Sequence, residues 1–227
     1  MHTLILDTSG TYTSVAVIQD EAVLGFAALK IQPLSHLHDL IRTMARQLDL
    51  AMTAFDQIGV VIGPGSWTGL NIGVTAAKTL AQVLEVPVVA LPTLDALVAA
   101  RRWTPGRVCA LLNAKRDNVY CAWYPTDATG AVRLADGHAQ VMPFSAWTDA
   151  LTQETSTPLV VEYGDAYQER LHPLRPAVCL ANQEQLSPEA LLLTLKIHQT
   201  TPHTGDALLT LSPDYMQPSL AERDWPG

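Results

Sequence analysis

The sequence predicts an α/β protein of two lobes, each with its elements in the order β-β-β-α-β-α. Three observations predict it: short β-branched or apolar runs alternate with segments of helical periodicity, the order begins again after residues 101–106, and 227 residues suffice for two lobes of about 100 residues each. We therefore expect domains at 1–103 and 104–227, with the extreme C-terminus packing back on the first lobe.

The first lobe opens with three predicted strands at residues 3–7, 13–18 and 22–29, which are separated by Ser-Gly-Thr and Gln-Asp-Glu turn signals. Tight links of this kind predict an antiparallel meander. Residues 33–50 carry leucines, Ile41 and Met44 at helical spacing, with polar residues on the other faces, and predict an amphipathic helix. The remaining elements of the lobe are predicted as a strand at 58–62, a helix at about 68–84, a strand at 86–90 and a helix beginning near residue 92.

The second lobe is predicted by the same patterns. Its expected elements are strands at 107–113, 118–124 and 131–142, a helix at 143–154, a strand at 158–164, a short helix at 165–172, a strand at 176–180 and a helix at 187–199. The doubled order indicates an ancient duplication, although no residue-level repeat supports it.

Charge and cysteine content exclude several classes of protein. The formal net charge is −8 and the Lys and Arg residues are scattered, so the chain lacks the electrostatic footprint of a protein that binds nucleic acid alone. If RNA is involved, we expect another subunit to hold it. Cys109, Cys121 and Cys179 have no C-x-x-C spacing and indicate neither a disulfide framework nor a zinc site. Asp7 interrupts the apolar run that a signal peptide needs, and no stretch approaches the ~18 apolar residues of a membrane helix, so we expect a cytoplasmic protein.

A glycine-rich bend, VVIGPGSWTGLNIGV at residues 60–74, joins a strand to a helix. Its glycines can take positive φ, and its Ser and Thr can cap the helix, so an anion could bind there. It is not a P-loop, because no Lys follows Gly69, and its G-x-G-x-x-x-G spacing after the fourth strand is not a dinucleotide-binding fingerprint. Together with the end of the first strand, the bend supplies the candidate vestigial nucleotide or anion site: Asp7, Thr8, Ser9, Gly65 and Ser66.

The helix after the bend carries small residues every four positions, at Gly69, Gly73, Ala77 and Ala81. This stripe permits close approach of another element. Two interpretations stand side by side: the stripe packs on its own sheet or first helix, or it docks on a helix of another protein.

The patterns expected of several catalytic sites are not present. No two histidines have the H-x-x-x-H spacing of a metal site, Ser66 does not lie in a G-x-S-x-G elbow, and Cys121 lies inside a strand. Asp7 is interpreted either as a turn and cap residue or as the remnant of an anion or magnesium site. We expect no catalytic residue and no metal ligand.

Several stretches together resemble the bacterial TsaB (YeaZ) family. They are LILDTSGTYTSVAV, His36 at the start of the first helix, GPGSWTGLNIGVTAAKTLA, VPVVALPTLDAL, NAKRDNVYCAWY, VVEYGDAY and SPDYMQPSLAE. The resemblance is dense in the first half and sparse in the second. It implies the two-lobed actin-like ATPase fold, related to ribonuclease H. At Asn71 and at Met216-Gln217 the family usually has basic residues, and this departure puts a nucleotide site on this subunit in doubt.

The resemblance also implies a function. TsaB-like proteins are non-catalytic partners of a TsaD-like transferase and a TsaE-like ATPase, and the complex transfers a threonylcarbamoyl group to the adenosine beside the anticodon of tRNAs that read codons beginning with A. The first two helices of such proteins bind the partner or, without it, a second copy. No intrinsic cofactor is implied, and ATP or ADP at the junction of the complex is left open.

These inferences define the predicted partner-binding surface: His36, Leu37, Leu40, Ile41, Met44, Leu70, Gly73, Val74, Ala77, Lys78 and Ala81. The alternative functions are an independent ATPase or small-molecule kinase of the same fold, a homodimeric scaffold outside tRNA modification and, lower, a peptidase.

Overall fold

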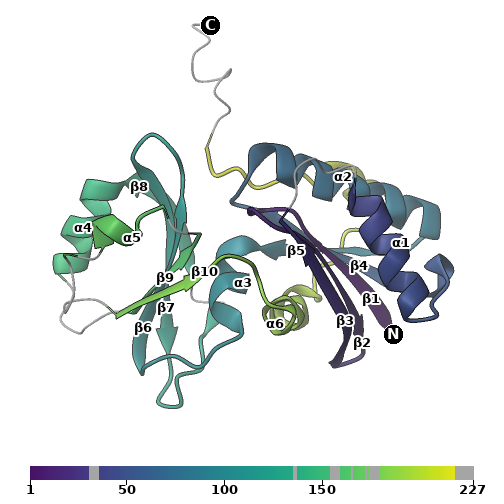
Figure 1. Cartoon of the computed structure of the whole chain (residues 1–227), viewed down its shortest axis with the longest axis horizontal. Helices are drawn as coiled ribbons and strands as arrows, with labels where there is room; N and C mark the ends of the chain where they lie inside the picture. Colours follow the sequence, from purple (N-terminus) through teal and green to yellow (C-terminus); the bar gives the residue numbers. More distant parts are fainter. Residues whose placement is uncertain are drawn as a thin grey trace, which may run out of the picture.

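In the computed structural model the chain forms two five-stranded sheets, shown in Figure 1. The structure describes residues 1–30, 36–134, 137–153, 159–164, 166–171, 173 and 179–217. The first sheet has the strand order β3-β2-β1-β4-β5 and the second β10-β9-β6-β7-β8. The strands are β1 (His2–Asp7), β2 (Thr13–Gln19), β3 (Ala22–Leu29), β4 (Gln57–Gly63), β5 (Val88–Pro92), β6 (Gly106–Asn113), β7 (Asn118–Thr126), β8 (His138–Pro143), β9 (Leu159–Tyr163) and β10 (Cys179–Gln183).

Both sheets have the same topology. An antiparallel meander, β1–β3 or β6–β8, is extended by two parallel strands on the side of its first strand. The predicted α/β class with a doubled element order is therefore confirmed.

Helices cover the sheets in layers (Figure 1). Helices α1 (Leu37–Gln47), α2 (Trp67–Leu84) and α7 (Asp206–Thr210) pack on the outer face of the first sheet, and α4 (Phe144–Thr152) and α5 (Gln168–Leu171) on the outer face of the second. Helices α3 (Thr93–Ala99) and α6 (Pro188–His198) lie between the sheets. The single turn at Met52–Ala54 is 3₁₀-helical.

These layers form because the side chains of each strand point alternately to the two faces of its sheet. In β1, Ile5 faces the core between the lobes, while Leu4 and Leu6 face α1 and α2, because successive strand residues point to opposite faces. The helix α2 begins where the Ser66 hydroxyl accepts the Gly69 amide at 3.2 Å, and it ends at Glu85, whose φ is 56°.

The layer between the sheets also joins the lobes through polar contacts. The Tyr124 hydroxyl of β7 donates to Asp95 Oδ1 of α3 at 2.6 Å, and His198 Nε2 of α6 lies 2.8 Å from Asp95 Oδ2. Residues after α6 then return to the first sheet: His203 pairs with Val88. The predicted domain boundary at 103/104 stays a prediction, and residues 218–227 lie outside the described residues.

Two element predictions differ from the structure. The strand predicted at 131–142 is wrong in its first half: β8 begins only at His138, Val132 forms an isolated bridge with Thr126, and the Gly137 amide donates to the Leu134 carbonyl at 3.0 Å. A Cβ at Gly137 would lie 2.0 Å from the Tyr124 ring, so a larger residue at this position would displace that buried ring. Helix α7 was not predicted at all, since five residues carry too little periodicity to be recognised. Predicted helix or strand positions 33–35, 135–136, 154, 158, 165, 172 and 176–178 lie outside the described residues.

Candidate site in the cleft between the lobes

A cavity of about 1040 Å³ opens between the two lobes, at the carboxyl ends of β1 and β6. Both lobes line it, and its lining includes the side chains of Ser9, Lys30, Ser66, Trp67, Lys115, Arg116, Tyr120, Tyr163, Glu184 and Tyr215. None of the described helices combines the length and apolarity that crossing a membrane takes.

A buried carboxylate lies beneath the first-lobe wall of the cleft. Asp7 ends β1, and its Oδ1 accepts the Ser9 amide at 2.9 Å and the Ser9 hydroxyl at 2.7 Å. Burial raises the pKa of Asp7, and the two hydrogen bonds from Ser9 oppose that shift. This is the turn and cap arrangement that the sequence offered as one interpretation.

Two hydroxyls lie buried near this carboxylate: that of Ser14, which is directly across the β1–β2 ladder from Asp7 and has no hydrogen-bond partner among the described residues, and that of Tyr163 of β9, which lies beside Ser9. Burial raises the pKa of Tyr163 well above its usual value, and the charge of Asp7 raises it further. The Tyr163 ring reaches the first lobe because Gly10 has no side chain: a Cβ there would lie 2.3 Å from the Tyr163 hydroxyl.

The glycine bend lets α2 begin directly against the loop after β1. A Cβ at Gly65 would lie 2.5 Å from the Ser9 carbonyl oxygen, and one at Gly69 only 2.0 Å from the Thr8 carbonyl oxygen. The Ser66 amide donates to the Ser9 carbonyl at 2.7 Å, and the Thr8 hydroxyl donates to the Gly69 carbonyl at 2.7 Å. Of the predicted anion-site residues, Ser9, Gly65 and Ser66 therefore line the cleft, while Asp7 and Thr8 lie beneath it. Anion binding there stays a prediction.

An aromatic pair stands at the mouth of the cleft. The Trp67 and Tyr215 rings stack with centroids 3.6 Å apart and planes 16° from parallel. Tyr215 is held from both lobes, because its carbonyl accepts the Tyr120 hydroxyl at 3.1 Å and the preceding Asp214 amide donates to the Ile62 carbonyl at 2.8 Å. Sequence reasoning did not assign Tyr120, Tyr163 or Tyr215 to a site, since nothing in their local pattern indicates which surface they reach.

The opposite wall is a charged turn between β6 and β7. Lys115, Arg116 and Asp117 all have positive φ, at 63°, 48° and 62°. Such backbone is unfavourable for residues with a Cβ and persists where neighbouring contacts hold it. Here the Asn113 carboxamide accepts the Lys115 amide at 2.7 Å, and the Phe144 amide donates to the Asp117 carbonyl at 2.8 Å.

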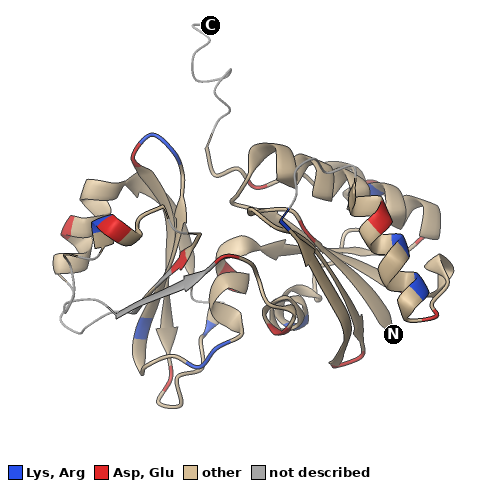
Figure 2. Cartoon of the chain, viewed as in Figure 1, with Lys and Arg blue, Asp and Glu red and all other residues tan. Residues whose placement is uncertain are grey.

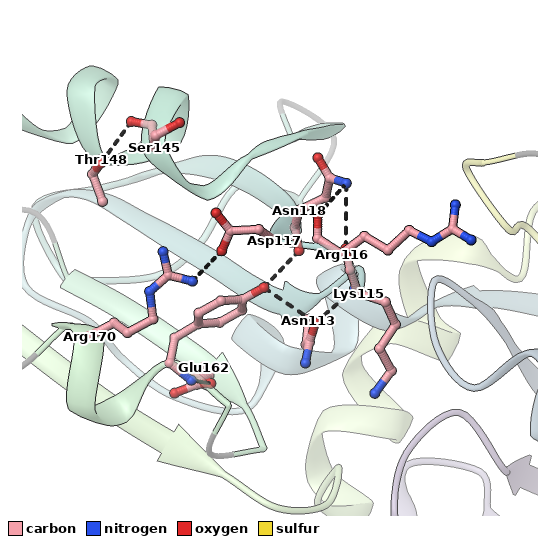
Figure 3. Close-up of polar contacts among 10 residues, drawn as sticks. Asn113, Lys115, Arg116, Asp117, Asn118, Ser145, Thr148, Glu162 and Arg170 are labelled. Atoms are coloured by element: carbon pink, nitrogen blue, oxygen red, sulfur yellow. Dashed lines mark hydrogen bonds and ion pairs between the residues drawn. The ribbon is translucent and has the colours of Figure 1, made fainter.

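Figure 3 shows how this turn separates its charges. Asp117 points toward Arg170 and forms an ion pair with it, whereas the side chains of Lys115 and Arg116 extend to the other side. The Arg170 guanidinium in turn lies 3.8 Å from the centre of the Phe144 ring. The turn therefore presents its two cations to the cleft and its anion away from it.

The residues predicted to bind a partner lie on α1 and α2, and all except His36 and Lys78 are buried within the lobe. Leu37, Leu40, Ile41 and Met44 pack on the first sheet together with Val74 and Ala77 of α2. The small-residue stripe also faces inward: a Cβ at Gly73 would lie 2.2 Å from the Thr8 hydroxyl oxygen.

In this structure the stripe thus follows the first of its two interpretations, packing on its own sheet. Lys78 also has an internal role, because its Nζ donates to the Leu209 and Leu211 carbonyls at 2.9 and 3.0 Å. Binding of a partner at this pair of helices stays a prediction. The side chains that a partner would meet are the exposed ones of α1 and α2: His36, His38, Asp39, Arg42, Thr43, Arg46, Gln47, Trp67, Thr68, Thr75, Thr79, Gln82 and Val83.

The two side chains considered as nucleophiles are Ser66, whose hydroxyl forms a hydrogen bond within the fold, and Cys121, whose thiol stays protonated. The Ser66 hydroxyl accepts the Gly69 amide as a helix cap. Burial raises the pKa of the Cys121 thiol to about 11, which keeps it neutral at physiological pH. Within the described ranges, no cluster of three or more His, Cys, Asp or Glu side chains could hold a metal ion.

Comparisons with known proteins agree with the fold and the resemblance. The family model of TsaD, tRNA N6-adenosine threonylcarbamoyltransferase, matches residues 33–135. The tRNA threonylcarbamoyladenosine biosynthesis protein TsaB of Bacillus subtilis (strain 168) is 26% identical over 231 residues, covering 99% of this chain and 98% of that protein. The TsaB of Escherichia coli (strain K12) is 31% identical over 148 residues, 63% of each chain.

Solved structures show the same likeness. YeaZ from Pseudomonas aeruginosa has a TM-score of 0.73 and 27% identity, over 94% of this chain and 99% of that chain. The ethanolamine utilization protein EutJ from Carboxydothermus hydrogenoformans has a TM-score of 0.51 and 13% identity, over 86% of this chain and 90% of that chain, and shows the shared fold alone. The predicted two-lobed actin-like fold is confirmed.

Proposed function

We propose, from the place of this chain in the TsaB (YeaZ) family, that it is an accessory subunit in the synthesis of threonylcarbamoyladenosine in tRNA. It pairs with a TsaD-like catalytic subunit, works with a TsaE-like ATPase, and is required for threonylcarbamoyl transfer to the adenosine beside the anticodon. Alone, it forms a homodimer. The observation that carries this proposal is the similarity to TsaB across 99% of the chain.

The geometry of the cleft supports a non-catalytic role. Asp7 is buried and accepts two hydrogen bonds from Ser9, the Ser66 hydroxyl caps α2, and Cys121 is a neutral buried thiol. The groups that could start chemistry are thus committed to holding the fold. The proposal includes no cofactor bound by this chain alone and leaves open ATP or ADP at the junction between subunits.

The outer faces of α1 and α2 support a role in pairing. Both helices pack on the same face of the first sheet, so their exposed sides both point away from that sheet. The exposed side of α2 includes Val83, which is 74% exposed, beside the short side chains of Thr75 and Thr79. An exposed apolar residue among short side chains suits a packed interface between helices.

The test of the role is threonylcarbamoyl transfer to tRNA in a reconstituted mixture of the catalytic subunit, the ATPase and this chain, against the same mixture without the chain. We expect modified tRNA only when the chain is present, and none from the chain alone. Equal transfer without the chain would overturn the proposal.

The test of the surface is Val83→Glu, with Val141→Glu as its control. Both valines are exposed, but Val141 lies on β8 in the other lobe. A buried charge at an interface is costly, so Val83→Glu should weaken pairing roughly tenfold or more in analytical ultracentrifugation, while Val141→Glu should not change it. Equal effects of the two substitutions would rule out this face.

A further inference from the structure

We infer that the mouth of the cleft between the lobes is a direct contact for single-stranded RNA, with phosphates on Lys30, Lys115 and Arg116 and a base against the Trp67–Tyr215 stack. This inference rests on the proposed function, because it names the part of the subunit that touches the tRNA. It departs from the expectation that only another subunit holds RNA.

The balance of charge is inverted at the cleft. The whole chain has 14 Lys and Arg against 22 Asp and Glu, but the described residues that line the cleft include three of the former and one acidic residue, Glu184. Glu184 Oε2 lies 3.9 Å from Lys30 Nζ, so the one acidic residue among the described residues of this lining is next to Lys30. Figure 2 shows basic residues on the turn between β6 and β7, while both signs are scattered elsewhere. Walls of one sign concentrate the opposite charge, so the cleft favours a polyanion although the chain as a whole does not.

The backbone of the turn that carries two of these cations is held in an unfavourable conformation. Three consecutive residues with a Cβ, Lys115 to Asp117, have positive φ. The result is that Lys115 and Arg116 line the cleft while Asp117 is turned to Arg170. Unfavourable backbone that sorts charge in this way is typical of a binding site.

The aromatic pair supplies a surface for a base. Trp67 is 46% exposed although its ring is stacked on Tyr215. An exposed aromatic ring in a cleft that is also lined by cations is the combination by which proteins hold single-stranded nucleic acid without reading its sequence.

The deep end of the cleft is unsuited to a mononucleotide. The Ser66 and Gly69 amides at the start of α2 already donate to protein oxygens, and the buried Asp7 carboxylate lies beneath them. A phosphate there would find these two amides already engaged. The cations instead belong to separate segments around the mouth, Lys30 after β3 and Lys115–Arg116 after β6, which suits an extended strand.

The experiment measures binding of a fluorescein-labelled RNA hairpin with an anticodon loop, by anisotropy over a series of salt concentrations. It uses the full chain, alone and mixed with its catalytic partner. The variant is Lys115→Gln with Arg116→Gln, and the matched control is Arg101→Gln with Arg102→Gln, an exposed basic pair that does not line the cleft.

We expect the cleft variant to bind roughly tenfold more weakly and to lower the slope of log affinity against log salt by about 0.7 for each lost phosphate contact. Trp67→Ala should weaken binding with the slope unchanged, because stacking releases no counterions. The control pair should leave both quantities as in the native chain. Thermal unfolding checks that each variant folds, and Lys30→Gln replaces any variant that does not.

Several results would overturn the inference: the same affinity in the cleft variant, the same loss in the control pair, or displacement of the hairpin by poly-glutamate or ATP at equal charge concentration. The last would assign the cleft to an acidic protein segment or a free nucleotide. If the reconstituted transfer needs the chain but the cleft variant binds and transfers normally, this inference fails and the proposed function stands. Transfer without the chain would instead remove the proposed function.

Discussion

The two lobes share one strand topology but differ at the carboxyl end of their first strand. In the first lobe β1 ends in Asp7, and the eighteen-residue helix α2 begins against the loop after that strand. In the second lobe β6 ends in Asn113 and leads into a tight charged turn, while α5, at the place of α2, has four residues. One lobe thus has a closed polar junction and the other an open basic turn. Equal topology does not produce equal sites, because the turns and helices after the strands make the site.

The closed junction of the first lobe depends on glycine. A Cβ at position 69 would lie 2.0 Å from the Thr8 carbonyl oxygen, which belongs to the backbone and cannot rotate away. We expect Gly69→Ala to lower the free energy of unfolding by about 3 kcal/mol, as overpacking does. Urea unfolding measures it, with Thr79→Ala on the exposed side of α2 as the control, for which a change within about 0.5 kcal/mol is expected. Equal free energies of unfolding for Gly69→Ala and Thr79→Ala would mean that the junction can shift to accommodate the added Cβ.

The buried carboxylate of the first lobe makes stability depend on pH. Burial raises the pKa of Asp7, so the folded chain binds the proton more tightly than the unfolded one, and stability falls as pH rises from the ordinary value of 3.8 toward the raised one. Asp7→Asn removes the charge but keeps an oxygen for Ser9. We expect the variant to be more stable than the native chain at pH 7, with the difference vanishing below the ordinary pKa of 3.8.

That difference is measured by urea unfolding at pH 7 and at pH 3. A difference that stays constant with pH would show that Asp7 is not the titrating group.

In the turn between β6 and β7, a glycine should remove backbone strain. This is the opposite of the junction in the first lobe, where the native glycine is required. Arg116 has φ of 48°, a conformation that costs a residue with a Cβ about 1 kcal/mol. We expect Arg116→Gly to gain about that much stability, whereas Arg116→Ala, which loses the same charge but keeps the Cβ, should not. Thermal unfolding measures the Tm of both variants. Equal Tm values would show that the backbone at Arg116 is not strained.

The smallest expected effect concerns the interior of the second lobe. The Cys121 thiol, with a pKa raised to about 11 by burial, should remain unmodified by iodoacetamide at pH 8 in the folded chain and react in urea. Peptide mapping by mass spectrometry measures the modified fraction at this position. Modification in the folded state would show that this interior opens.

Much of the fold could be predicted from the sequence, because strand alternation and helix periodicity are local properties. The apolar stripe of α1 is an example: its periodicity shows that Leu37 and Ile41 are covered, but not by which surface. Their cover is the chain's own sheet rather than a partner. The cleft could be predicted in part, through Ser9, Gly65 and Ser66. Tyr215 could not be assigned, since its contact with the Trp67 ring joins positions far apart in the sequence.

Helix α6 has a consequence for how the protein is made. Although it lies near the end of the chain, at residues 188–198, it packs on the inner face of the first sheet through Leu191 and Leu195. During synthesis the first lobe leaves the ribosome long before this helix does, so the part of the sheet that α6 covers, on β2, β3 and β5, stays without this helix until the second lobe is nearly complete. The first lobe is therefore finished last, and during that interval a chaperone has an apolar sheet face to bind.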